Sequence, residues 1–485
     1  MAPKDPPPFN PKRRRFIKGM AATGALALSG CSSNGGDNSG IATGPGDLPT
    51  LPDPKDSGID HIVVVMMENR SFDHFLGWVP GADGMQAGLQ FPDKKGKMQS
   101  TFRLSQNADY GFQSCGKADP DHSYKGGRIQ LNSGTLDGWL KTDGTQAGDL
   151  FPIGYYTADD VPFFKGVAQN FTLCDRYFSG ILSSTFPNRV YMHSGQTDRN
   201  SNTLPIVQQA PSTLPTIWDL LQAKNRAMRY YFFDLPITGL WGLKYFNISG
   251  QFNQFLIDAS LGNLPDVAYI DPFFGASVGE APPGISRDDH PLADVRDGQA
   301  FLNQIYEALR NSPQWDRTLL IINYDEWGGF YDHVVPPIAP VSKAEVAATG
   351  NDGRLGYRVP CAIMGPRARR AHVSHLQFDP NSILNFIRWR FDLGTLSPRD
   401  ETSLNLAYAL DFDSAPNTSA PAFDVPSSLT GFGSECDTGL PFPLPAVPTQ
   451  AFLDSILDPA ARSQAEHLFE LQSLRNLLIA TGWPI

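Results

Sequence analysis

The chain has 485 residues and a formal charge of −11. The first 30 residues hold six basic side chains and one acidic side chain, so the remainder is more acidic than the total suggests. Phosphate backbones are bound through basic surface, and this balance therefore argues against nucleic acid as a partner. The length exceeds that of one ordinary domain, although an α/β enzyme with insertions can fill it.

Residues 1–30 have the pattern of a signal peptide. A basic start is followed by a short apolar stretch and small residues, and the stretch is far shorter than the roughly 20 residues that cross a bilayer. Arg13-Arg14 with Phe16-Ile17-Lys18 resembles the bacterial twin-arginine export signal. We therefore expect export by the twin-arginine route.

The leader closes with Leu28-Ser29-Gly30-Cys31, which resembles a lipobox whose cysteine is acylated. A lipid on Cys31 would anchor the protein in the bacterial cell envelope, facing the periplasm or the exterior. Ser32, rather than Asp, follows the cysteine and favours an outer membrane. Residues 31–58 are rich in Gly, Ser, Asp and Pro without hydrophobic periodicity and are predicted to be a flexible tether.

Four further cysteines follow Cys31 without CxxC spacing, namely Cys115, Cys174, Cys361 and Cys436. An even number in an oxidising compartment permits two disulfides, but spacing alone does not give their pairing.

Apolar, β-rich runs alternate with helical patterns along the chain, which predicts an α/β fold with a central, mostly parallel sheet and helices on both faces. The predicted strands are 62–67, 171–178, 318–326 and 359–365, and the predicted helices are 216–222, 297–310 and 382–391. We expect residues 59–400 to form a catalytic domain, with the aromatic stretch 200–285 as an insertion. Residues 401–485 are expected to be a C-terminal extension packed on the core through an amphipathic helix at 465–483.

Two predicted strands end in polar pairs, Glu68-Asn69 and Asp325-Glu326. Ligands of open parallel sheets bind beyond the carboxyl ends of the strands. Burying a bare carboxylate is costly, so a shared cation is an alternative to simple solvation of these ends. Carboxylate and amide oxygens form a set suited to a hard divalent ion.

The second predicted strand, 171–178, is followed by Thr185-Phe186-Pro187-Asn188-Arg189 at an expected helix start. Thr185 is either an N-cap or, beside a metal, a nucleophile. Arg189 is either an anion clamp or a partner in a salt bridge.

Several segments together resemble the bacterial phosphoesterases that include phospholipase C and the single-metal acid phosphatases, within the alkaline phosphatase-like superfamily. They are MMENRSFDHFLG (66–77), DPDHSYKGG and NSGTLDGW (119–139), STFPNR (184–189), DDHP (288–291) and YDEWGGFYDHVVPP (324–337). Weaker similarity extends through 356–366 and 382–400, so the likeness covers about 59–400.

The resemblance implies one divalent metal ion held by Glu68, Asn69, Thr185, Asp325 and Glu326. It implies that Thr185 attacks phosphorus while bound to the metal and forms a phosphothreonine that water then releases. His122 and His290 match positions that face the phosphate and would donate a hydrogen bond to it or protonate the leaving group. Arg189 and His333 are assigned to the substrate phosphate.

One position departs from the family pattern. Relatives read Asp-His-Thr-Ser before the helix that begins near Ile383, whereas this chain reads FDPNSIL, with Pro380 in place of the histidine. Asp379 is retained, and His375 stands five residues before Pro380. The role of that family histidine is therefore open here.

Thr185-x-Pro187-x-Arg189 also overlays the sulfatase signature, but sulfatases use formylglycine made from Cys or Ser. Threonine would give a ketone instead, which leaves phosphate esters.

The predicted function is metal-dependent hydrolysis of a phosphoester, with phospholipid as one candidate substrate. The alternatives are an acid phosphatase, which the short segment after residue 400 favours, and a lipid-anchored binding protein that has lost catalysis.

Overall fold

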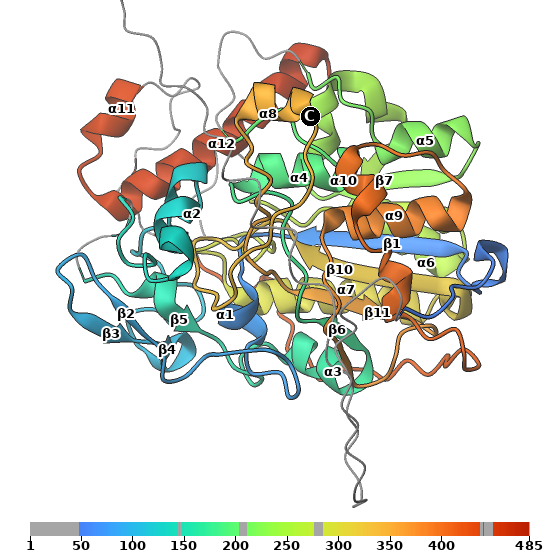
Figure 1. Cartoon of the computed structure of the whole chain (residues 1–485), viewed down its shortest axis with the longest axis horizontal. Coiled ribbons are helices and arrows are strands. Elements are labelled where there is room, and N and C mark those ends of the chain that lie inside the picture. Colours follow the sequence, from blue (N-terminus) through green and yellow to red (C-terminus); the bar gives the residue numbers. More distant parts are fainter. Residues whose placement is uncertain are drawn as a thin grey trace, which may run out of the picture. The chain divides into compact units, whose positions relative to one another are not determined.

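An eight-stranded sheet with helices on both faces organises the structure (Figure 1). This computed structural model describes residues 48–143, 145, 148–202, 211–275, 285–436, 440 and 450–484. The predicted signal peptide, Cys31 and most of the predicted tether lie outside the described residues. Within them, no helix combines the length and apolar character that a membrane span requires.

The sheet follows the order β12-β6-β11-β10-β1-β9-β7-β8. Its strands are β1 (His61–Met67), β6 (Thr172–Cys174), β7 (Met228–Phe232), β8 (Ser249–Gln251), β9 (Val267–Ile270), β10 (Thr318–Tyr324), β11 (Cys361–Met364) and β12 (His372–Ser374). β11 is antiparallel to both neighbours, and every other pair is parallel. Two small sheets pair β2 (Gln90–Pro92) with β3 (Met98–Ser100) and β4 (Phe102–Arg103) with β5 (Gly154–Tyr155).

The central strands are built from aliphatic and β-branched side chains. β1 and β10 are buried almost throughout and pair in parallel from His61 opposite Thr318 to Met67 opposite Tyr324. Strands buried on both faces read as continuous apolar runs, which is the pattern of these two segments. Because β9, β1 and β10 are mutually parallel neighbours, their carboxyl ends share one edge of the sheet.

Helices cover the two faces in separate layers (Figure 1). α3 (Pro162–Asn170) and α6 (Phe252–Leu261) contact α7 (Val295–Arg310), whereas α5 (Ile217–Ala223) and α9 (Pro380–Phe391) contact α4 (Thr185–Ser194). The remaining helices are α1 (Phe72–Leu76), α2 (Tyr124–Leu131), α8 (Lys343–Thr349), α10 (Pro398–Thr402), α11 (Gln450–Ser455) and α12 (Pro459–Thr481), with a long 3₁₀ segment η6 (Ile237–Ile248).

Local sequence explains where these helices begin. Thr216 and Asp219 form a capping box at α5, and Asp379 caps α9 with Ser382 as its reciprocal partner and Pro380 as the first helical residue. In α7, Phe301, Leu302, Ile305 and Leu309 recur at helical spacing and are buried in the main core.

The predicted α/β fold with a mostly parallel sheet is confirmed. The predicted strands correspond to β1, β6, β10 and β11, and the predicted helices to α5, α7 and α9. β7, β8, β9 and β12 were not predicted, because runs of three to five residues give too little periodicity to separate strand from helix.

The segment 200–285, predicted as an insertion, supplies β7, β8 and β9 of the same sheet. The described end of the predicted tether also contacts the domain, since Leu51 packs against the core and Arg367 donates a hydrogen bond to the Ser57 carbonyl. At the other end of the chain, α12 buries Leu474 and Leu478 in the same core and contacts η6.

One disulfide joins Cys115 to Cys436, with Cα atoms 5.3 Å apart and 321 residues between them. Cys174 and Cys361 are free and buried on neighbouring strands. Among the described cysteines, one of the two disulfides that their number permits is therefore formed, and it ties the C-terminal segment to the loop before Asp119.

We predict that replacing Cys115 and Cys436 with Ser lowers the free energy of unfolding by about 2–4 kcal/mol, because the cross-link closes a long loop in the unfolded chain. Chemical denaturation of the double variant and the oxidised parent measures the difference. Non-reducing peptide mapping is the control, and recovery of a Cys174–Cys361 link in place of Cys115–Cys436 would contradict the assigned pairing.

Candidate active site

Three adjacent strands deliver a carboxylate to the same edge of the sheet. Glu68 follows β1, Asp325 follows β10 and Asp271 follows β9, and all three side chains are buried. Glu326 is buried beside Asp325. Asp271 was missed in the sequence, although VAYID (267–271) repeats the pattern of an apolar run closed by an acid.

Arg189 of α4 lies among these carboxylates. Its guanidinium is 2.9 Å from Asp271 Oδ1, 3.1 Å from Glu68 Oε1 and 3.7 Å from Asp325 Oδ2. The side chain is 1% exposed. Of the two roles open to Arg189, the structure favours the salt bridge, because carboxylates surround the guanidinium that would otherwise clamp phosphate.

One guanidinium does not balance the negative charge that is buried here. Burial raises the pKa of Glu68 well above its usual range, Arg189 opposes the rise, and the charges of Asp325, Asp288 and Asp271 increase it. Burial likewise raises the pKa of Glu326 well above its usual range, with Asp325 adding to the effect. It also raises the pKa of Asp271 to about 6.

Several polar atoms of this group have no hydrogen-bond partner among the residues that the structure describes. They are Glu68 Oε2, Asn69 Oδ1 and Nδ2, Asp325 Oδ2 and Glu326 Oε1. Buried polar groups are normally satisfied, so this set needs an explanation. A hard divalent cation would satisfy the oxygens and offset the excess charge, and the donor set fits such an ion.

The backbone around Asn69 holds this set in place. Asn69 has φ +62°, a left-handed conformation that asparagine tolerates, and its N–H donates to Asp325 Oδ1 at 3.0 Å. Gly328, with φ +62°, packs so closely that an added Cβ would lie 2.0 Å from the Asn69 carbonyl oxygen. Glycine is therefore required at position 328 to let the two polar strand ends meet.

Thr185 is the first residue of α4, after Ser184 at the N-cap, and its side chain is buried. Burial raises the pKa of Asp325 overall. The Thr185 hydroxyl interacts with the Asp325 carboxylate and is one of the groups that oppose this rise. The structure thus brings Thr185 together with the predicted ligands, as α4 enters the site from a different part of the chain.

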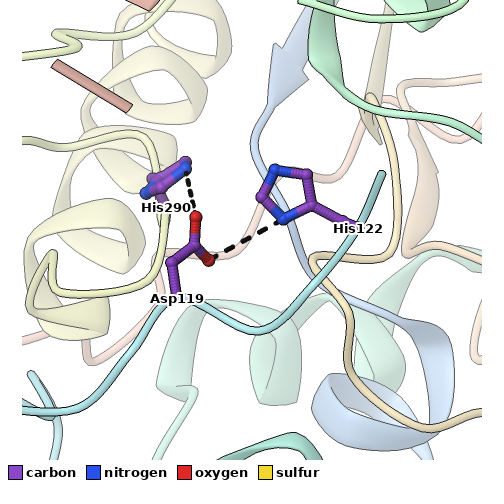
Figure 2. Close-up of side chains that lie close together, drawn as sticks. All are labelled: Asp119, His122 and His290. Carbon is purple, nitrogen blue, oxygen red and sulfur yellow. Dashed lines mark ion pairs between the residues drawn. The ribbon is translucent and has the colours of Figure 1, made fainter. Parts of the chain in front are cut away.

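A second group, formed by Asp119, His122 and His290, adjoins the carboxylates. Figure 2 shows Asp119 between the two imidazoles, with His290 Nε2 3.5 Å from Oδ2 and His122 Nδ1 3.7 Å from Oδ1. Ligand-type atoms of the three residues lie within 4.8 Å of one another, which also suits a metal ion. The charge of Asp119 contributes to the raised pKa of Glu326, so the two groups are electrostatically coupled.

Both histidines are fixed in one tautomer by backbone carbonyls. Nδ1 of His122 donates to Pro120 O and Nδ1 of His290 donates to Pro291 O, each at 3.0 Å, because a carbonyl oxygen only accepts. Burial lowers the pKa of each imidazole. Each ring is therefore neutral near pH 7 and presents an unprotonated Nε2.

A cavity of about 650 Å³ opens over this group. Its walls include Asp119, His122, Ser184, Asn202, His467 and Glu470. The last two belong to α12 and were not predicted as site residues. Their only signal in the sequence is that polar side chains at 463, 467 and 470 share one face of a helix that otherwise buries leucines.

His333 is not brought to this cavity. Its Nδ1 lies 2.5 Å from Asp73 Oδ2 and its Nε2 lies 3.1 Å from Asp83 Oδ1, so carboxylates engage both ring nitrogens. Arg358 pairs with Asp73 and with Asp332 in the same cluster. The Arg358 guanidinium supplies positive charge to this cluster. The position of His333 therefore gives no support to its assignment to the substrate phosphate.

The residues around Pro380 are also accounted for structurally. Asp379 caps α9, accepting from the Ser382 N–H and from the Ser403 hydroxyl. His375 Nδ1 lies 2.7 Å from Asp175 Oδ2, just beyond β6. Neither Asp379 nor His375 lines the cavity described above.

Comparison with known proteins places the chain in a family. A model of the Phosphoesterase family matches residues 59–394, which is more than half of the chain. The chain belongs to the Phosphoesterase family. The prediction of a hydrolase acting on phosphoric ester bonds is thereby confirmed at the level of enzyme class.

Relatives of this phosphoesterase include named phospholipases. It is 31% identical over 436 residues to non-specific phospholipase C6 of Arabidopsis thaliana, covering 83% of this chain and 78% of that one. It is 29% identical over 518 residues to phospholipase C B of Mycobacterium tuberculosis, covering 90% and 95%. The length of this phosphoesterase therefore gives no preference for an acid phosphatase.

Similar solved structures include an alkaline phosphatase superfamily protein from Vibrio parahaemolyticus, with a TM-score of 0.36, 11% identity and coverage of 90% of this chain and 93% of that one. The lipoteichoic acid synthase LtaP of Listeria monocytogenes gives a TM-score of 0.37 at 8% identity, covering 90% and 94%. These likenesses are weak, and the family assignment rests on the sequence matches.

We predict a pH-dependent contribution of His333 to stability. Burial lowers the pKa of its imidazole, but the hydrogen bond and charge of Asp73 outweigh this and raise the pKa above its ordinary value. The contribution should be complete below about pH 6.5, the unfolded value, and should be lost as the pH rises through the folded-state pKa. Denaturant unfolding of the parent and His333→Gln between pH 5 and 9 measures it, and an unchanged difference between them across that range would contradict it.

Proposed function

We propose that this phosphoesterase hydrolyses phosphodiesters of the phospholipid type, with Thr185 as nucleophile and one divalent metal ion. The observation that carries the proposal is the set of buried oxygens without a hydrogen-bond partner, on Glu68, Asn69, Asp325 and Glu326, beside the Thr185 hydroxyl. The names of the phospholipase C relatives support the substrate class.

The four residues Glu68, Asn69, Asp325 and Glu326 would hold the metal ion together with Thr185. When bound, a divalent ion supplies electrostatic stabilisation of charge that develops on phosphoryl oxygens. The first turn of α4 places a positive helix end near Thr185, which favours an anion.

The reaction would proceed in two displacements. Thr185 Oγ1 loses its proton and forms a bond to phosphorus while the bond to the leaving alcohol breaks, and the alcohol oxygen takes up a proton in turn. Water then attacks the phosphothreonine and restores the hydroxyl. The Nε2 of His122, held unprotonated on the cavity wall, is placed to accept a proton from that water.

The cavity favours a diester over a monoester. Burial raises the pKa of Asp119 well above its usual range and that of Glu470 to about 8, so neither adds full negative charge near pH 7. The remaining acidic side chains on the walls still outnumber the basic one, with Asp121, Asp143 and Glu466 against Arg462. A phosphomonoester carries nearly two negative charges at neutral pH, whereas a diester carries one. Repulsion from the acidic walls therefore disfavours binding of a monoester more strongly than binding of a diester. This disfavours the acid phosphatase alternative.

We further propose that the protein reaches its substrate from an envelope anchor. The twin-arginine pattern at Arg13-Arg14 and the lipobox ending in Cys31 support export and acylation. Mass spectrometry of the mature protein tests this directly, because an acylated Cys31 would be its first residue.

We predict that Thr185→Ala lowers kcat at least about 1,000-fold, because the covalent step loses its nucleophile, whereas Thr185→Ser keeps measurable turnover. Assays use p-nitrophenyl phosphorylcholine and p-nitrophenyl phosphate with protein resupplied with single divalent ions. A higher kcat/KM for the diester is expected. Preference for the monoester would make the protein an acid phosphatase, and no turnover with any ion would favour the binding protein.

We predict that Asp325→Asn reduces the retained metal from near one equivalent per protein to well below it. The substitution replaces a negatively charged ligand with a neutral amide, which weakens the attraction for a divalent cation. Metal content after dialysis, measured by atomic emission, gives a readout that is independent of activity. Asp143→Asn, an exposed acid on the cavity wall, is the matched control and should retain metal like the parent. Equal retention in Asp325→Asn and the parent would contradict the ligand assignment.

A further inference from the structure

The C-terminal helix α12 lies beyond the segment that the family model matches, which ends at residue 394, yet it reaches the active site. Ser463, His467 and Glu470 are spaced four and three residues apart and therefore share one face of the helix. Each contacts a different part of the site. We propose that α12 is an integral wall of the active site, in which His467 and Glu470 are positioning residues for His290 and Thr185.

His467 stacks on His290. The ring centroids are 3.6 Å apart and the planes are inclined by 19°. Because Nδ1 of His290 is fixed by the Pro291 carbonyl, the stack constrains the remaining freedom of the ring and directs Nε2 toward Asp119. Burial lowers the pKa of His467 to about 3, so it stacks as a neutral aromatic ring.

Glu470 acts on the segment that carries the nucleophile. Its Oε2 accepts a hydrogen bond of 2.7 Å from Asn202 Nδ2. Asn202 Oδ1 in turn accepts one of 2.6 Å from the N–H of Phe186, the residue after Thr185. This chain of contacts fixes the first turn of α4, whose N–H groups have no partner within the helix.

Ser463 completes the attachment. Its Oγ accepts a hydrogen bond of 3.0 Å from the Asp119 N–H. One helix thus holds the Asp119 segment, the His290 ring and the start of α4, which come from three separate parts of the chain. The docking of α12 does not depend on these polar contacts alone, since Leu474 and Leu478 anchor it in the main core.

The test compares truncating and conservative variants of the two positioning residues, and it rests on the proposed hydrolysis. Small displacements of catalytic groups can cost on the order of 100-fold in rate, so we expect His467→Ala and Glu470→Ala to lower kcat about 10- to 100-fold. KM should change by less than kcat. His467→Phe retains a stacking ring, and Glu470→Gln retains an acceptor for Asn202, so each should recover most of the lost kcat.

Gln472→Ala is the matched control, because Gln472 is on the same helix and bonds only to Asn476 among the described residues. Its kcat and thermal midpoint should match those of the parent. Full kcat in His467→Ala and Glu470→Ala would overturn the role of α12 while leaving hydrolysis intact. A loss shared equally by the truncating and conservative variants, accompanied by a lower thermal midpoint, would show a merely structural role. An inactive parent would overturn the proposed function and, with it, this proposal.

Discussion

The candidate active site depends on an excess of negative charge buried at one edge of the sheet. Glu68, Asp271 and Asp325 end three neighbouring parallel strands, and Arg189 is the cation that pairs with all three. Removing an ion from water costs several kcal/mol even after relaxation, so such a group is stable only when its charge is offset. Under the proposed function, a further cation would bind the oxygens of Glu68, Asp325 and Glu326 that have no hydrogen-bond partner among the described residues.

The fold makes this concentration of charge possible. Parallel pairing of β9, β1 and β10 fixes the carboxyl ends of all three strands at one edge, and their buried apolar bodies hold that edge rigid. The tight packing of Gly328 on Asn69 then sets the distance between two polar strand ends. A catalytic group held by buried strands and helix starts loses little entropy when substrate arrives, which is the physical basis of preorganisation.

Much of this could be read from the sequence because the signals are local. An apolar run closed by Glu68-Asn69 or Asp325-Glu326 marks a strand end, and Thr185 before Pro187 marks a helix start. Asp271 carried the same signal in a shorter run and was missed. Roles that depend on partners distant in the sequence could not be predicted. Arg189 pairs with Asp271 and His333 pairs with Asp73, and no feature of the neighbouring sequence indicates either pairing.

The contribution of α12 to the site could not be predicted from the sequence for the same reason. Its sequence shows an amphipathic helix, and that pattern states that one face is buried without stating against what. His467 contacts His290, which lies 177 positions earlier in the chain, and Glu470 contacts Asn202, which lies 268 positions earlier. A helix near the C-terminus therefore forms one wall of a site that is built on the sheet. The disulfide from Cys115 to Cys436 attaches the C-terminal segment to the loop before Asp119, the residue whose N–H donates to Ser463 of this helix.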